Sequence, residues 1–119
     1  MTLYLYIIFF INLINMNLID DECIYKVWIH SYEEEDETKK VYRSSSFNFP
    51  LSRGRDSFEI KKNGEIVSYT IGALDDYQKK IGKFEIKNSN KLYIYFNKTK
   101  PNIMTILSCE MDRLVIQKN

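Results

Sequence analysis

Four residues that could act together in binding lie on three neighbouring segments of the chain: Trp28, His30, Arg43 and Glu59. Trp28 and His30 are two positions apart, so in a strand they share one face. On an inward-facing surface, the Arg43 guanidinium could bind a ligand carboxylate bidentately while Trp28 supplies apolar area. Buried charges must be paired, so a purely structural network of these four residues is the competing interpretation.

The same residues offer little to catalysis or metal binding. His30 is the single histidine, and in a strand it faces away from Glu33, so the two do not converge on a metal. No Ser–His–Asp arrangement can be placed. The acidic run 33–37 lacks the alternating Asp/Asn and Gly spacing of a calcium loop, which indicates a solvated loop. We therefore expect a protein that is not an enzyme and that carries no metal or cofactor.

Composition indicates a single globular β domain. The 119 residues include nine Tyr and seven Phe against four Gly and two Pro, a balance that favours strands over disorder. The formal net charge of +1 gives no field that would recruit nucleic acid. Nucleic acid is therefore not an expected partner.

Eight strand-like segments follow one another with short connections. They are Cys23–Tyr32, Val41–Phe47, Ser57–Lys62, Glu65–Ile71, Ile81–Lys87, Lys91–Asn97, Ile103–Cys109 and Arg113–Lys118. Asn63-Gly64 is a strong hairpin signal, because both residues tolerate the positive φ of a type I′ turn. Residues 72–80 are expected to hold at most a short helical turn.

An unbroken series of hairpins leaves two exposed edges unless the sheet closes. The sequence therefore predicts an all-β fold, an eight-stranded antiparallel up-and-down (meander) barrel. In such a meander the loops around residues 33–40, 63–64, 88–90 and 110–112 form the mouth. The opposite end is closed by residues 47–55, 72–80 and 97–102.

Several motifs together resemble small lipocalin-like (calycin-type) β-barrel proteins. They are residues 28–34 (WIHSYEE), 41–43 (VYR), 52–55 (SRGR) with Phe58-Glu59, 81–86 (IGKFEI) and 106–116 (ILS…DRLVI). The resemblance implies ligand binding inside the barrel. It also implies an Arg packed over the first-strand Trp28, and in the meander Arg53 or Arg55 lies at the right end to close the barrel there. A departure is Lys26, where lipocalins usually have Gly.

We therefore expect non-catalytic binding of a small apolar or amphipathic molecule. The residues expected to bind it are Trp28, His30, Arg43, Phe58, Glu59, Phe84, Ile86, Ile94 and Phe96, with His30 and Arg43 as polar contacts. The alternative is a structural or interaction module whose barrel is filled by its own side chains, since eight strands enclose little space.

Residues 1–19 contain no charge and include the apolar run 3–14. They are expected to be a secretory signal peptide or a hydrophobic N-terminal anchor preceding the barrel domain at 20–119, unless the chain starts further downstream. The protein is then secreted or extracytoplasmic, with membrane contact only through an uncleaved segment.

The two cysteines, Cys23 and Cys109, begin the first segment and end the seventh. In the meander these positions lie at opposite ends, about 20 Å apart. That separation is beyond the reach of a disulfide, so two unpaired thiols are expected.

Overall fold

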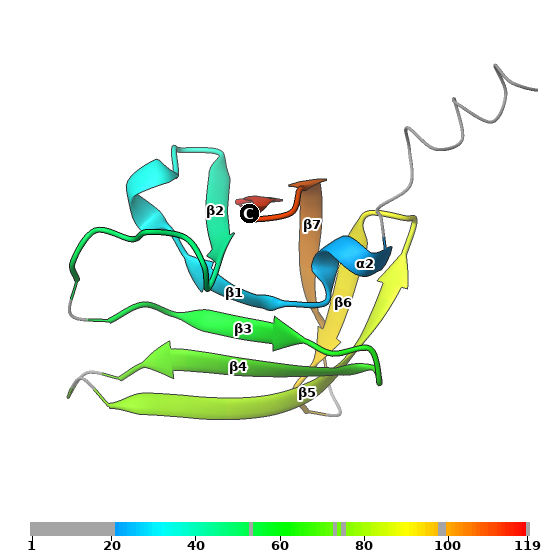
Figure 1. Ribbon diagram of the computed structural model, residues 1–119. Coiled ribbons are helices and arrows are strands. Elements are labelled where there is room, and N and C mark those ends of the chain that lie inside the picture. The colour runs from blue at the N-terminus through cyan, green and yellow to red at the C-terminus, as the bar shows by residue number, and fades with distance from the viewer. Residues whose placement is uncertain (1–20, 53, 73, 75, 98–99, 119) are drawn as a thin grey trace, which may run out of the picture.

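The computed structural model describes residues 21–52, 54–72, 74, 76–97 and 100–118. Eight antiparallel strands close into a barrel, which confirms the predicted all-β fold (Figure 1). The strands are β1 (Val27–His30), β2 (Lys39–Ser44), β3 (Ser57–Ile60), β4 (Glu65–Ile71), β5 (Tyr77–Lys87), β6 (Lys91–Tyr95), β7 (Asn102–Cys109) and β8 (Arg113–Gln117). Two short helices accompany them, α2 (Asp21–Ile24) and the 3-10 helix η1 (Tyr32–Glu34).

The strand order follows the predicted meander from β3 to β8 and departs from it at the first two strands. β1 lies between β2 and β3, and β2 pairs with β8. Residues 45–56 therefore carry the chain from β2 past β1 to β3. The connection makes this possible because it is much longer than the 2–5 residues typical of a hairpin loop.

This exchange changes which loops share an end of the barrel. Because β2 and β3 are both antiparallel to β1, they run in the same direction. The turns at 61–64, 88–90 and 110–112 then lie at the end that holds α2. Residues 31–38, 72, 74, 76, 96–97 and 100–101 lie at the other end, where β8 also ends. The predicted grouping of residues 33–40 with the first three turns is therefore wrong.

Alternating side chains fill the interior, as the period-two pattern predicts. In β6, Leu92 and Ile94 are buried and their neighbours are half-buried. The buried core also includes Ile24, Trp28, Phe58, Ile60, Ile66, Ile106, Leu114 and Ile116. At the α2 end, Ile24 and Trp28 are fully buried.

The hairpin predicted at Asn63-Gly64 joins β3 to β4, but its turn is not type I′. Only Gly64 has positive φ, at +92°, and its N–H donates to the Lys61 carbonyl at 3.2 Å. The consecutive left-handed pair that a type I′ turn needs occurs instead at Asn88 and Ser89, with φ of +55° and +62°.

Strand β5 begins earlier than the sequence indicates. Residues 77–80 are not a helical turn but continue the ladder with β4, where Thr70 pairs with Gln78 and Ile71 with Tyr77. Tertiary pairing overrides a segment whose own residues are mostly polar. Residues 1–19, the predicted signal peptide or anchor, lie outside the described residues. Within the described ranges, no helix is both long enough and apolar enough to cross a membrane.

Candidate functional site

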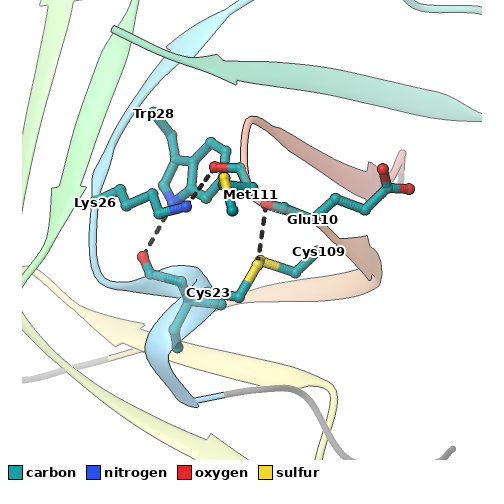
Figure 2. The surroundings of a disulfide bond; sticks show 7 residues. Cys23, Lys26, Trp28, Cys109, Glu110 and Met111 are labelled. Atoms are coloured by element: carbon teal, nitrogen blue, oxygen red, sulfur yellow. Dashed lines mark hydrogen bonds between the residues drawn. A yellow bond between two sulfur atoms is a disulfide. The ribbon is translucent and has the colours of Figure 1, made fainter. Parts of the chain in front are cut away.

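One end of the barrel is closed by the N-terminal helix. The Trp28 indole Nε1–H donates to the Ile24 carbonyl oxygen at 3.0 Å, so α2 folds back over the barrel (Figure 2). Cys23 and Cys109 form a disulfide with a Cα–Cα distance of 6.1 Å. The prediction of two unpaired thiols is therefore wrong. Because β1 sits between β2 and β3, β7 runs opposite to β1, and Cys109 ends up beside the start of β1.

The cation over Trp28 is not the predicted arginine. Lys26 Nζ lies 5.6 Å from the centre of the Trp28 ring and donates to the Met111 carbonyl oxygen (Figure 2). Arg55 lies at the other end, where it forms a bidentate ion pair with Glu33. The position of β3 explains the difference, because β3 begins where β1 ends. Arg53 lies outside the described residues.

Arg55 holds the 45–56 connection against the end of β1. Its guanidinium donates to the carbonyl oxygens of His30 and Pro50, both at 3.0 Å. It also lies between two aromatic rings, 4.6 Å from that of Tyr32 and 4.7 Å from that of Phe49. Arg55 is 9% exposed, and every one of these contacts is within the chain. Its role is structural, and it fixes a loop at the open end.

The predicted constellation of Trp28, His30, Arg43 and Glu59 is divided between two faces of the barrel wall. His30 pairs with Tyr42 and Trp28 with Phe58, all on the inner face. Arg43 pairs with Ile29, and Glu59 with Val27, on the outer face. The interpretation of Arg43 and Glu59 as ligand contacts inside the barrel is therefore wrong.

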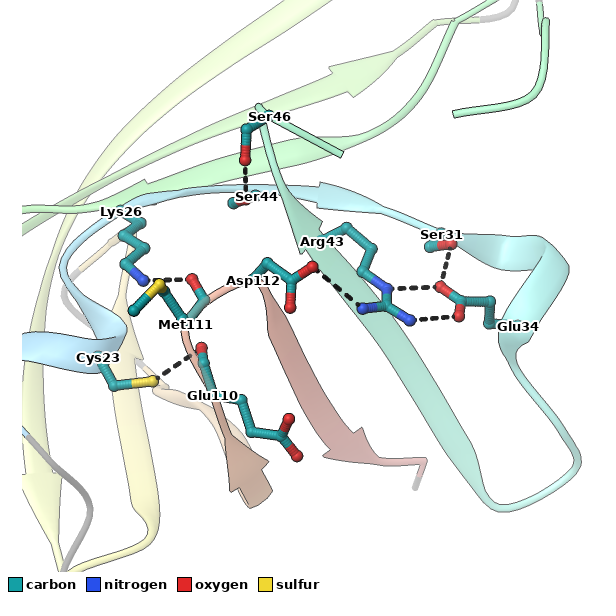
Figure 3. Close-up of polar contacts among 10 residues, drawn as sticks. All are labelled: Cys23, Lys26, Ser31, Glu34, Arg43, Ser44, Ser46, Glu110, Met111 and Asp112. Carbon is teal, nitrogen blue, oxygen red and sulfur yellow. Dashed lines mark hydrogen bonds and ion pairs between the residues drawn. The ribbon is translucent and has the colours of Figure 1, made fainter. Parts of the chain in front are cut away.

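Arg43 belongs to a polar network on the outer face (Figure 3). Its Nε and Nη2 donate to the two Glu34 oxygens at 2.8 and 2.6 Å, and Nη1 lies 3.5 Å from Asp112. Ser31 Oγ donates to Glu34 at 2.7 Å. The hydrogen bond from Arg43, followed by that from Ser31, outweighs partial burial and lowers the Glu34 pKa to about 2. This network fastens η1 to β2 and, through Asp112, to the β7–β8 turn.

The end opposite α2 holds an open cavity of about 470 Å³. Its apolar wall contains Phe58, Ile66, Ile94, Phe96, Met104 and Ile116, together with the ring of Tyr42. Its polar lining includes Lys40, Asp56, Ser57, Ser68, Tyr69, Thr70, Asn102 and Lys118. Three residues predicted to bind a ligand thus line the cavity: Phe58, Ile94 and Phe96.

Three other predicted ligand contacts lie elsewhere. Trp28 fills the closed end. Phe84 packs against the core near Tyr25, with ring centres 6.4 Å apart, and Ile86 is 36% exposed. Both follow Gly82 on the part of β5 that runs toward the closed end. The alternation of Phe84 and Ile86 with polar residues correctly indicated a strand. It did not show which end of the barrel the two side chains lie near.

Tyr42 is the main cavity residue that the sequence did not single out. Its ring lies 5.1 Å from that of His30 and 4.9 Å from that of Phe58. Burial, reinforced by the negative charges of Asp56 and Glu35, raises the Tyr42 pKa to about 12. The hydroxyl therefore stays protonated at physiological pH. The available signal was its alternation with Arg43, which places one of the two residues inside and the other outside.

His30 supports the cavity wall instead of lining it. Its Nε2 lies 3.0 Å from Glu35 Oε2, and Lys118 Nζ lies 3.8 Å from the other oxygen of the same carboxylate. Glu35 thus links the end of β1 to Lys118, the residue after β8. This arrangement fixes the position of His30 against the Tyr42 ring.

The geometry describes a closed antiparallel barrel with one plugged end and one open, mainly apolar cavity. Among the described residues, no three His, Cys, Asp or Glu side chains cluster closely enough to hold a metal ion. No known family model, no curated protein and no solved structure matches the chain.

Proposed function

We propose that this protein binds a small apolar or amphipathic molecule, without catalysis, in the open cavity of its barrel. The observation that carries this proposal is the open cavity of about 470 Å³ at the end of the barrel opposite α2. Sites for small molecules typically measure about 300–1,000 Å³ and are mostly apolar with a few polar groups. The cavity has this size and this composition.

The plugged end supports a binding role as well. A barrel open at both ends would let water through, whereas α2, Trp28 and the disulfide close one end. An apolar chain that enters at Lys40 and Asn102 then meets Phe58 and Phe96 in the cavity. Burial of apolar surface there supplies the binding free energy.

The relation to lipocalin-like proteins is proposed on architecture alone. Both have a closed eight-stranded antiparallel barrel, which in lipocalins is up-and-down. Here β1 and β2 exchange places relative to that order. We propose a barrel that works like a lipocalin while differing from it in the first two strands.

We also propose that the protein acts outside the cytoplasm. A disulfide between Cys23 and Cys109 supports this, because such bonds persist mainly in oxidising compartments. The apolar N-terminal run, residues 3–14, fits a signal peptide or a membrane anchor.

Binding is tested with the full chain and the neutral fluorescent probe N-phenyl-1-naphthylamine. The variant Thr70→Trp puts a large ring at the mouth, where Thr70 is exposed and lines the cavity. Its matched control is Thr105→Trp on the outer side of β7, because Thr105 pairs with the outward Lys91. Saturable binding that Thr70→Trp weakens at least about fivefold, and Thr105→Trp does not, supports the proposal. Equal binding by all three proteins contradicts it.

The alternative is a structural or interaction module that takes no small ligand. The outer faces of β6 and β7 favour it, because Tyr93 and Ile103 are cross-strand neighbours there and Ile103 is 43% exposed. Leu107, further along β7, is 46% exposed. Failure of the probe to bind any variant would shift the proposal to this outer surface.

A further inference from the structure

Some of the polar side chains that line the cavity have no hydrogen-bond partner among the described residues. Tyr42 lines the cavity, and its hydroxyl makes no hydrogen bond within the described part of the chain. The same holds for the side chains of Ser68, Thr70 and Asn102. Thr70 and Asn102 are exposed at the rim, whereas Tyr42 and Ser68 are only partly exposed, so the hydroxyls of Tyr42 and Ser68 are positioned for groups of a bound molecule or for water.

The two lysines that line the cavity lie on one side of it. Lys40 on β2 pairs with Ile116 on β8, and Lys118 follows two positions later, so both side chains flank Ile116 at the rim. Lys118 is engaged by Glu35 at 3.8 Å. Lys40 has no ion pair or hydrogen bond from its side chain among the described residues. Of the two lysines among the described cavity-lining residues, Lys40 is therefore the one available to a ligand.

Asp56 is the carboxylate among the described residues that line the cavity, and both it and Glu35, the partner of Lys118, are already engaged. Asp56 accepts the backbone N–H of Ile71 at 3.0 Å, and Glu35 lies between His30 and Lys118. Asp56 begins the opposite wall, just before β3. A bound anion is therefore favoured on the β2–β8 side, beside Lys40 and away from Asp56.

We infer that the ligand is an anionic amphipathic molecule. Its acidic head lies at Lys40, with the Tyr42 hydroxyl as a neutral hydrogen-bond donor below it, and its apolar chain extends toward Phe58 and Phe96. This inference rests on the proposed function and adds to it the charge and orientation of the ligand. The chemistry is that of a carboxylate on an alkyl chain.

The test measures displacement of N-phenyl-1-naphthylamine from the full chain by dodecanoate, methyl dodecanoate and dodecylammonium, all below micelle-forming concentrations. Dodecanoate is expected to bind about fivefold more tightly than methyl dodecanoate. Its advantage over dodecylammonium should be larger than fivefold. Lys40→Met should remove that fivefold preference and leave the ester unchanged. Lys39→Met is the matched control, because Lys39 is the adjacent residue on the outer face. Tyr42→Phe should weaken the acid and the ester alike, by about threefold.

The possible outcomes separate the two proposals. If the probe itself does not bind, the proposed function fails. If the probe binds but the acid and the ester compete equally, or Lys40→Met and Lys39→Met behave alike, the cavity remains and the anionic head is overturned. Tighter binding of dodecylammonium would overturn it too and would assign the polar contact to Asp56. Circular dichroism of Lys40→Met and Lys39→Met verifies folding, which neither exposed substitution should disturb.

Discussion

The Cα atoms of Cys23 and Cys109 lie 6.1 Å apart, and their disulfide joins α2 to the last residue of β7 across 86 positions of sequence. The bond holds the N-terminal helix against the closed end of the barrel. Ile24, the next residue after Cys23, is fully buried there and accepts the Trp28 hydrogen bond. Disulfide, helix and indole therefore form one cap at the end opposite the cavity.

Removing the disulfide should destabilise the protein strongly. A cross-link that closes so long a loop restricts the unfolded chain, and Cys23→Ala with Cys109→Ala should cost about 3 kcal/mol of unfolding free energy. Denaturant unfolding of the oxidised protein and the double variant measures the difference. Thiol titration of denatured, unreduced protein should find no free thiol. Two titratable thiols would show that the pair is open.

Gly82 is expected to tolerate no side chain. It is buried on the inner face of β5, where a Cβ would lie 2.6 Å from the Tyr95 carbonyl oxygen and 2.8 Å from the Phe96 ring. Gly82→Ala should therefore cost about 1–3 kcal/mol of unfolding free energy, measured by denaturant titration. Because the nearest atom belongs to the backbone, Phe96→Ala should not rescue Gly82→Ala. Full rescue would show that the Phe96 ring alone excludes a side chain at this position.

The Glu34–Arg43 pair should make stability depend on pH in the acid range. The folded-state pKa of Glu34, about 2, lies below its ordinary value of 4.5. Its contribution is therefore present above pH 4.5 and is lost as pH falls toward 2. With the Glu34 side chain 31% exposed, we expect about 1 kcal/mol.

The measurement compares unfolding free energies of the native protein and Glu34→Gln from pH 7 to 2. The difference should be largest at neutral pH and should shrink as the carboxylate of the native protein is protonated. Glu37→Gln is the control, because Glu37 makes no ion pair within the described part of the chain. A Glu34→Gln difference that stays constant down to pH 2 would rule out this linkage.

The sequence predicted the local features well, because each has a local cause. Alternation at Leu92 and Ile94 indicated a strand with one buried face, and the interior confirms it. Asn63-Gly64 indicated the β3–β4 hairpin, although Gly64 alone supplies the positive φ. Closure of the sheet followed from the need to satisfy its edges.

The candidate site was harder to predict because it depends on pairing between distant segments. Whether Arg43 or Tyr42 faces inward is decided by the register of β2 against β1, and a shift of one residue reverses it. The position of β1 between β2 and β3 is likewise not predicted by any local sequence pattern. That one exchange accounts for both the missed disulfide of Cys23 and the misplaced Arg55.

Tyr42 should be almost dispensable for stability at neutral pH and unfavourable at high pH. Its hydroxyl makes no hydrogen bond within the described chain, so Tyr42→Phe should change the unfolding free energy by no more than about 0.5 kcal/mol at pH 7. Its folded-state pKa of about 12 lies above the ordinary value of 10. The unfolded chain therefore loses this proton first, and the native protein loses stability as pH rises from 10 to 12. Unfolding titrations across this range should show the phenylalanine variant gaining about 2 kcal/mol relative to the native protein. A flat difference would mean that the hydroxyl reaches water easily and that the cavity is wetter at Tyr42 than its apolar walls indicate.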